Sequence, residues 1–332
     1  MMHLVRSMGM FGLLTATLSA PSLAFGQVNV VASIKPIHSL VASVMEGVGT
    51  PDLVVQGAGS PHTFTLRPST ARKIADADVV FWVGPGMENF LETPLSNLAP
   101  SAKIVSLKDA EGLKLLSFRE GGDFEAHEHG GDQHHDEHEA HDEHEHASAS
   151  HDDEEHDAQA FDMHLWLDPQ NAVVMLDEIA KTLSKADPEN AAKYAANAQA
   201  EEARINKLSK SLKVELENNH DKPFVVFHDA YRYFEEAYDL NAVGSVTVSP
   251  EVLPGARRLS QVRQKLESLG ASCVFSEAQF NPKMVAVLKE GTGVKTAELD
   301  PLGSNLQAGP QLYTDLLKQM GRTINECLSD NQ

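Results

Sequence analysis

Hydrophobic and polar positions form two kinds of segment along the first third of the chain: short apolar runs, and amphipathic stretches between them. The apolar runs predict buried strands at 28–34, 52–56, 79–83 and 103–107. The amphipathic stretches predict helices at 36–46, 68–77 and 88–98. An alternation of strands and helices predicts a parallel sheet covered by helices on both faces.

A second series with the same alternation occupies the last third of the chain. Its apolar runs predict strands at 224–227, 242–248, 273–276 and 294–299. Its amphipathic stretches predict helices at 230–238, 256–269, 282–290 and 311–327. The two halves therefore repeat one architecture, and the cleft between two such lobes is a natural place for a ligand.

One long amphipathic helix is predicted between the two series. Asp187 supplies an N-cap and Pro188 the first helical position, and no Gly or Pro follows before Pro223. Apolar side chains recur there at helical spacing, namely Tyr194, Ala198, Ile205, Leu208, Leu212 and Leu216. A helix of about 30 residues is about 45 Å long. We therefore expect an α/β fold of two βα lobes, with parallel sheets flanked by helices, joined by one long rigid helix.

The first 26 residues have the layout of a cleavable secretory signal. His3 and Arg6 precede an apolar run at 8–20, which is shorter than the roughly 20 residues that span a bilayer. Cleavage after Ala24 or after Gly26 would satisfy the preference for small residues. A buried N-terminal helix is the alternative interpretation. No Cys lies near either position, so we expect a soluble exported protein without a lipid anchor.

Charge is concentrated in one segment of the chain. The formal net charge is −21, from 48 Asp and Glu against 27 Lys and Arg. Residues 120–157 contain 16 of the acidic residues and no Lys or Arg, so the remainder is only mildly acidic. So acidic a chain is a poor partner for nucleic acid, because phosphate contacts need clustered Lys and Arg.

The same acidic segment holds ten of the 16 histidines. These are His127, His129, His134, His135, His138, His141, His144, His146, His151 and His156. The segment lacks a hydrophobic period and cannot offset the entropy of ordering by apolar burial, so we expect a disordered loop at 120–160. The expected order is a signal peptide, a lobe carrying this loop, a linking helix and a second lobe, at 1–26, 27–186, 187–220 and 221–332.

Polar residues next to the predicted strands are the candidate ligands, because ligands bind at the carboxyl ends of strands in α/β sheets. His62, His228 and Asp300 come soon after predicted strands, and His164 lies just before the helix that begins near Asp168. Three imidazoles and one carboxylate suit a tetrahedral zinc ion. A single histidine is more often a capping or packing residue, so the hypothesis depends on the set of four, two from each half.

Six motifs, in order over nearly the whole mature chain, carry a resemblance to a known family. They are Gly59-Ser60-Pro61-His62 with Leu66-Arg67-Pro68-Ser69, Met163-His164-Leu165-Trp166-Leu167, Val226-Phe227-His228-Asp229-Ala230-Tyr231, Pro250-Glu251 with Pro254-Gly255-Ala256, Cys273-Val274-Phe275-Ser276-Glu277, and Leu299-Asp300-Pro301-Leu302-Gly303. With them, the chain resembles the periplasmic zinc-binding proteins of high-affinity zinc ABC importers. The acidic His-rich loop also lies where zinc-binding members carry theirs.

The resemblance implies that metal is held in the cleft between the lobes. It implies ligand roles for His62, His164 and His228, with Asp300 as a fourth or alternative ligand. Some zinc-binding members have Glu immediately before the first histidine, where this chain has Pro61. The fourth ligand is therefore Asp300, a water molecule or a histidine of the loop.

The donor set also bears on the identity of the metal. Manganese-binding relatives carry a carboxylate in place of His228. Hard cations prefer oxygen ligands and imidazole suits zinc, so three histidines favour zinc over manganese. Cu(II) and Ni(II) bind such ligands at least comparably and stay open.

Two cysteines, Cys273 and Cys327, are present. An even number in an exported protein suggests a disulfide, with two buried free thiols as the alternative. The resemblance implies that these two residues form the disulfide.

The function implied by the resemblance is that of a carrier and not of an enzyme. We expect a periplasmic monomer that binds Zn²⁺ as its transported ligand and delivers it to an ABC importer permease in the inner membrane. The acidic His-rich loop would collect or sense zinc, and an acidic solubilising spacer is the alternative. The rival function is an exported zinc-dependent hydrolase that uses the same three histidines, with Glu277 as general base.

Overall fold

The structure is a computed structural model that describes most of the chain. The described residues are 28–119, 124, 161–247, 255–278, 286–287, 289–290 and 292–329. The expected signal peptide at 1–26 and the ten histidines of the expected loop lie outside the described residues.

The N-terminal lobe is built on a four-stranded sheet. Its strands are β1 (Val30–Ala32), β2 (Asp52–Leu53), β3 (Val79–Trp82) and β4 (Lys103–Ser106). All neighbours are parallel, in the order β2-β1-β3-β4. The helices that connect them are α1 (Lys35–Val44), α2 (Pro68–Ala75) and α3 (Asn89–Leu98). The central strands β1 and β3 are buried throughout, as expected for strands covered on both faces.

The C-terminal lobe repeats this arrangement. Its strands are β5 (Phe224–His228), β6 (Ala242–Thr247), β7 (Cys273–Ser276) and β8 (Lys295–Glu298), all parallel in the order β6-β5-β7-β8. In both sheets the second strand along the chain lies at the edge, next to the first strand. The helices here are α6 (Arg232–Tyr238) and α7 (Ala256–Leu269). The prediction of two matched βα lobes is confirmed, whereas most of the helix expected at 282–290 lies outside the described residues.

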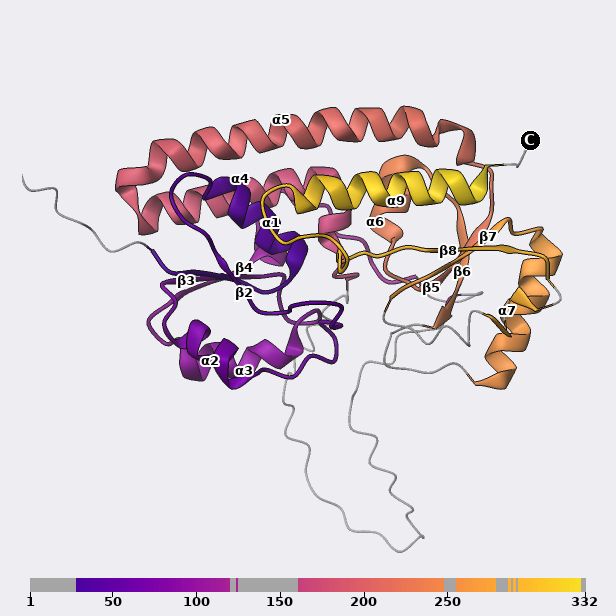
Figure 1. Cartoon of the computed structure of the whole chain (residues 1–332), viewed down its shortest axis with the longest axis horizontal. Coiled ribbons are helices and arrows are strands. Elements are labelled where there is room, and N and C mark those ends of the chain that lie inside the picture. The colour runs from indigo at the N-terminus through magenta and orange to yellow at the C-terminus, as the bar shows by residue number, and fades with distance from the viewer. Residues whose placement is uncertain are drawn as a thin grey trace, which may run out of the picture.

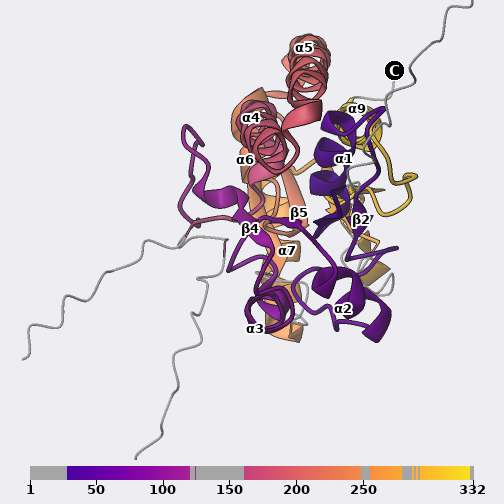
Figure 2. The ribbon, with the colours of Figure 1, turned by 90° about the vertical axis from the view of Figure 1, so that its left-hand side faces the viewer.

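A layer of helices runs across both sheets (Figure 1). It contains α4 (Pro169–Ala186), α5 (Ala191–Leu216) and α9 (Leu312–Leu328), together with α1. The long helix predicted between the lobes is present as α5, whose 26 residues extend about 39 Å. Short 3-10 turns, Pro188–Asn190 and Glu217–Asn219, flank it. Figures 1 and 2 show α9 alongside α5 and α1, so α9 packs beside the linking helix.

One hydrophobic core extends through both sheets and this helical layer. Trp166, Tyr194 and Tyr313 are fully buried within it. The indole Nε1 of Trp166 donates to the carbonyl oxygen of Pro301 at 2.9 Å. The hydroxyl of Tyr313 donates to the backbone carbonyl oxygen of Trp166 at 2.7 Å. These contacts join the middle of the chain, which belongs to the N-terminal lobe, to its C-terminal part, so the lobes are packed as one unit.

A disulfide fixes α9 to the C-terminal sheet. It joins Cys273 in β7 to Cys327 in α9, with the two Cα atoms 6.0 Å apart, as expected. At Gly321 of α9, an added Cβ would collide with Leu212 of α5. The absence of a side chain there therefore permits the close approach of the two helices.

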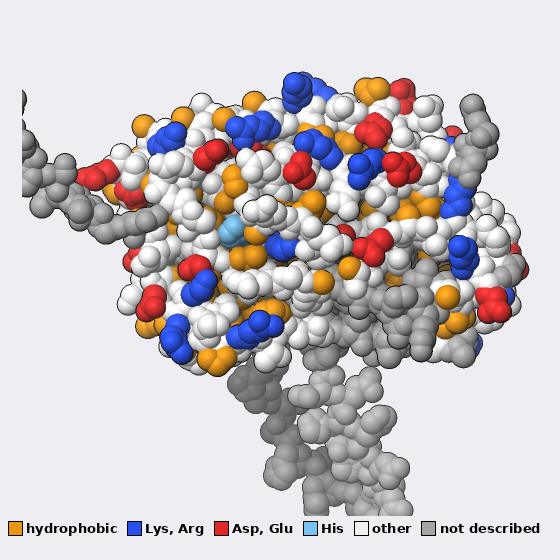
Figure 3. Space-filling model, in the orientation of Figure 1, with side chains coloured by type: hydrophobic (Ala, Val, Ile, Leu, Met, Phe, Trp, Pro, Cys, Tyr) orange, Lys and Arg blue, Asp and Glu red, His pale blue; other side chains and the backbone are white. Residues whose placement is uncertain are grey.

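The surface charge of the described part is mixed in sign. On the face shown in Figure 3, Lys and Arg are interspersed with Asp and Glu, and apolar side chains occur as small scattered spots. This agrees with a body that is only mildly acidic once residues 120–157 are set aside. Among the described helices, none combines the length and the apolar character needed to cross a membrane.

A buried carboxyl group fixes the turn that follows β3. Oε1 of Glu88 accepts hydrogen bonds from the hydroxyl of Ser33 at 2.5 Å and from the backbone N–H of Val83 at 3.1 Å. Oε2 accepts from the N–H of Gly84 at 3.0 Å. Burial raises the pKa of Glu88 to about 7 despite these three donors. Glu88 thereby connects the end of β1 to the turn between β3 and α3.

We expect Glu88→Ala to lower the free energy of unfolding by about 3 kcal/mol, because three buried donors lose their acceptor. Glu88→Gln keeps one acceptor oxygen and should lose less. The folded protein keeps a proton on Glu88 up to a higher pH than the unfolded chain does. The stability of wild type should therefore fall relative to that of Glu88→Gln as pH rises from about 4.5 to 7. Urea unfolding at both pH values measures this, and parallel pH profiles would contradict it.

Candidate metal centre

Three histidines from separate loops and strands meet between the two lobes. His62 lies in the loop between β2 and α2, and His164 directly precedes the 3-10 turn Leu165–Leu167. His228 is the last residue of β5. Each is at or near the end of a strand or the beginning of a helix, where backbone geometry points side chains toward the cleft. His62 and His164 come from the first half of the chain and His228 from the second.

The three imidazole rings are close enough to share one ion. One ring nitrogen of each lies within 4.8 Å of those of the other two. The ring centroids of His62 and His164 are 5.7 Å apart, those of His62 and His228 5.8 Å, and those of His164 and His228 5.0 Å. His164 and His228 are buried, while His62 is partly exposed. Because metal–nitrogen bonds are about 2.0–2.1 Å long, a small inward movement of the rings would let one ion bind all three nitrogens.

An aspartate orients one of these rings. Oδ1 of Asp162 lies 2.7 Å from Nδ1 of His164 and also accepts the backbone N–H of His164 at 3.0 Å. This partner fixes the ring and leaves Nε2 as the nitrogen that can bind a metal ion. Asp162 is almost completely buried, and burial raises its pKa to about 6. Sequence reasoning did not find Asp162, although its position two residues before His164 was a local signal.

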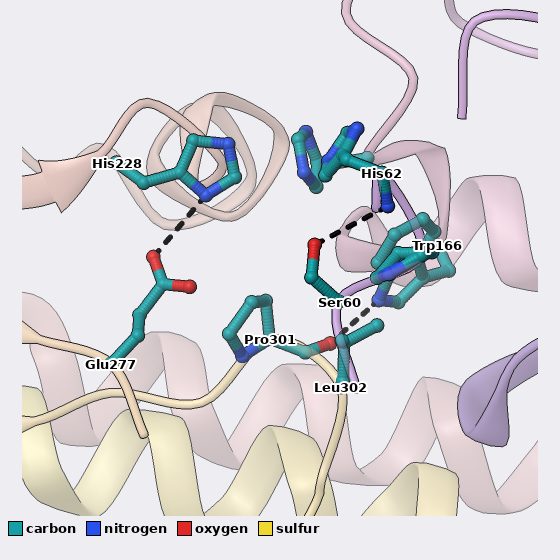
Figure 4. Close-up of a pocket in the computed structure, with 9 residues that line it drawn as sticks. Ser60, His62, Trp166, His228, Glu277, Pro301 and Leu302 are labelled. Carbon is teal, nitrogen blue, oxygen red and sulfur yellow. Dashed lines mark hydrogen bonds and ion pairs between the residues drawn. The ribbon is translucent and has the colours of Figure 1, made fainter. Parts of the chain in front are cut away.

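A glutamate lies behind the second ring. Oε1 of Glu277 is 3.3 Å from Nδ1 of His228, and both side chains are buried (Figure 4). Burial lowers the pKa of His228, but the carboxylates of Glu277, Asp229 and Asp162 outweigh burial and raise it above its usual value. Glu277, named from the sequence as a possible general base, therefore faces the side of His228 that carries Nδ1.

Asp300 takes part in a different set of contacts. Its Oδ1 accepts the backbone N–H of Leu302 at 3.0 Å. Its Oδ2 accepts the backbone N–H of Ser304 at 2.5 Å and the hydroxyl of the same residue at 2.6 Å. Among the described residues, the group placed to hold an ion consists of the three histidines and does not include Asp300. As an anchor of its own loop, Asp300 shapes the wall of the site through the residues that follow it.

The pocket around the three rings is small and has both apolar and polar walls (Figure 4). Besides the histidines it is lined by Ser60, Pro61, Trp166, Glu277, Pro301 and Leu302. The hydroxyl of Ser60 accepts the backbone N–H of His62 at 3.3 Å and so shapes the loop that carries this ring. The arrangement can bind one cation by nitrogen ligands.

The loop that carries Pro301 and Leu302 is held by a lysine of the N-terminal lobe. Nζ of Lys35, at the start of α1, donates to the carbonyl oxygens of Gly303, Ser304 and Leu306 at 3.2, 2.6 and 2.9 Å. Burial lowers the pKa of Lys35, and the charge of Asp300 acts in the opposite direction. One wall of the pocket is thus tied across the cleft.

Comparison with known proteins agrees with this geometry. The family model described as "Zinc-uptake complex component A periplasmic" matches residues 30–327. The chain belongs to this family. The expectation of a solute-binding protein of this kind is therefore confirmed, and the family gives no support to the rival hydrolase.

Several relatives within the family are similar over nearly their whole length. One from Brucella suis, named High-affinity zinc uptake system protein ZnuA, is 48% identical over 313 residues, which cover 93% of this chain and 94% of the relative. A protein of the same name from Yersinia pestis is 34% identical over 95% of this chain and 96% of its own.

Solved structures share the fold at lower sequence identity. A crystal structure of ZnuA has a TM-score of 0.72 at 22% identity and covers 92% of this chain and 100% of its own. The periplasmic zinc binding protein TroA from Treponema pallidum has a TM-score of 0.74 at 18% identity with the same coverage. The two-lobed architecture linked by a long helix is therefore common to both.

We expect Asp162→Ala to weaken binding of Co²⁺, a spectroscopic substitute for zinc, by about 10- to 100-fold, because His164 loses the partner that fixes its ring. A titration followed by visible absorption measures this. Asp52→Ala is the matched control, since Asp52 is an exposed carboxylate paired with Lys73. Equal affinities of the Asp162 and Asp52 variants would rule out an orienting role for Asp162.

Proposed function

We propose that this chain captures zinc between its lobes through His62, His164 and His228 and delivers it to an ABC-type permease for high-affinity uptake. The observation that carries the proposal is the convergence of three imidazoles from both lobes within 4.8 Å. Membership of the zinc-uptake family supports it. The fourth position of the ion belongs to water or a histidine of the acidic loop, or to Asp300 once its carboxylate gives up bonds within its own loop.

Zinc as the cargo follows from the donors that the site offers. Imidazole nitrogen suits zinc, whereas manganese and magnesium prefer oxygen ligands. The two nearby carboxylates, Asp162 and Glu277, face the Nδ1 atoms of two rings and so raise their basicity without occupying the centre. Relatives named for zinc uptake support the same cargo.

Transport requires export, binding and release, and we propose that this chain acts as a monomeric carrier in the periplasm. Residues 1–26 would be removed as a signal peptide, leaving no lipid anchor. Release to the permease would follow from a small change in the relation of the lobes, because the three ligands come from both of them. The acidic segment at 120–160 would collect zinc and present it to the cleft through its many weak ligands.

We expect His62→Ala, His164→Ala and His228→Ala each to abolish tight zinc binding, because two imidazoles hold the ion much less firmly than three. Competition titration against a chelator measures this. A variant lacking residues 123–157 is the control and should retain one tight site per chain. Wild-type affinity in all three histidine variants would exclude this site.

Zinc affinity should fall as pH drops through the range near 6.5, because protons compete for the ring nitrogens. The raised pKa of His228 means that its ring accepts a proton at a higher pH than usual, so the loss begins above the ordinary histidine range. Glu277→Gln removes the carboxylate beside this ring and should shift the onset to lower pH. Titrations between about pH 5.5 and 8 measure the onset, and an unchanged onset would contradict the role of Glu277.

A further inference from the structure

The acidic His-rich segment leaves and rejoins the fold through a paired stem, formed by residues 116–119 and 161–162. Ser117 pairs with Phe161 in an antiparallel bridge, and the N–H of Asp162 donates to the carbonyl oxygen of Leu116 at 2.9 Å. The hydroxyl of Tyr233, in α6 of the C-terminal lobe, accepts the N–H of Leu116 at 3.0 Å and donates to the carbonyl oxygen of Asp162 at 2.9 Å. The stem is therefore bound to the opposite lobe.

Arg119 is the last residue of the first segment of the stem, 116–119. Its guanidinium forms ion pairs with two carboxylates of the C-terminal lobe. Its Nε and Nη2 donate to the carboxylate of Asp229, with Nε at 3.2 Å. Its Nη1 and Nη2 donate to the carboxylate of Glu235 at 2.8 and 3.0 Å. The side chains of Arg119, Asp229 and Glu235 are 18, 6 and 7% exposed, so solvent screens these charges little. The ring of Phe124 covers the guanidinium, 4.0 Å from its carbon.

These contacts connect two of the three histidines without passing through the ion. Asp229 directly follows His228, and Glu235 also accepts the N–H of Ala242 at the start of β6. On the other side, the stem residue Asp162 holds the ring of His164. The position of His228 relative to His164 is therefore set by buried contacts that cross between the lobes at Tyr233 and at Arg119, and Arg119 supplies the charged crossing.

We propose that Arg119 is a positioning residue that fixes the separation of His164 and His228 and thereby sets zinc affinity and the rate of zinc release. The inference rests on the proposed function. A guanidinium binds two carboxylates through a rigid planar fork, which a lysine ammonium cannot reproduce. Loss of the fork leaves two buried carboxylates without their cation, which favours a shift of the turn that begins at His228 toward water.

The test compares zinc binding in Arg119→Ala, Arg119→Lys and Lys114→Ala. Lys114 is the matched control, because its Nζ pairs with Glu236 of α6 at 2.7 Å and links the same two parts of the molecule through exposed side chains. We expect Arg119→Ala to weaken zinc by about 10- to 100-fold and to speed its release, with Arg119→Lys between it and wild type. Lys114→Ala should stay within about twofold. Chelator competition and stopped-flow release measure these effects.

The absorption spectrum of the Co²⁺-saturated protein separates positioning from general destabilisation. A displaced His228 changes the ligand field, whereas a less stable fold with an intact site leaves the spectrum unchanged. The inference is wrong if wild type binds zinc tightly and the Arg119 variants match Lys114→Ala in affinity, release rate and spectrum. If Arg119→Ala does not fold, Arg119→Lys decides by the same criteria. Absence of tight binding in wild type would instead refute the proposed function itself.

Discussion

The site depends on holding imidazoles from two different sheets at a fixed separation. Within the described part of the chain, no hydrogen-bonded ladder connects the two sheets. A shift of about 1 Å in one ligand is about half the length of a metal–nitrogen bond, which is about 2 Å. The shared hydrophobic core, the helices α5 and α9 and the disulfide make the lobes one packed unit. We therefore expect binding and release to involve small displacements of the lobes, unlike those of a carrier with hinges of flexible strands.

Buried charge provides the directional part of this rigidity. Three ionisable side chains, buried or largely buried, each have several partners: three donors meet Glu88, three carbonyl oxygens meet Lys35, and two carboxylates meet Arg119. Charges without such partners would lose several kcal/mol by desolvation. Hydrogen bonds and ion pairs to these buried groups require a particular geometry. The groups therefore favour one arrangement of the lobes more specifically than apolar packing does. Lys35 and Arg119 both make contacts from one lobe to the other, Lys35 from the start of α1 and Arg119 from the stem.

Local pattern predicted most of the elements and made the three histidines candidates, and the resemblance to the zinc-binding family gave them ligand roles. Apolar runs located the strands, and polar residues at strand ends marked His62 and His228, because parallel strands bring their carboxyl ends to one edge. Asp300 satisfied the same rule, yet its carboxylate is bound to Leu302 and Ser304, two and four residues ahead. Aspartate often accepts backbone N–H groups a few residues ahead in a turn. This turn role competes with a ligand role, and both must be weighed to predict the contacts of Asp300. Arg119 was out of reach of sequence reasoning, because its partners lie more than 100 residues away.

The stem has a consequence for how this protein can vary. Since Ser117 and Phe161 are already paired, the ends of the intervening segment are held together by the fold and not by the segment itself. The entropy of closing a flexible loop grows only with the logarithm of its length, so doubling the segment changes stability by about 0.6 kcal/mol. A change in its length or in its number of histidines should therefore have little effect on the stability of the fold. A change in the length or composition of this insert should likewise leave the centre of three histidines in place.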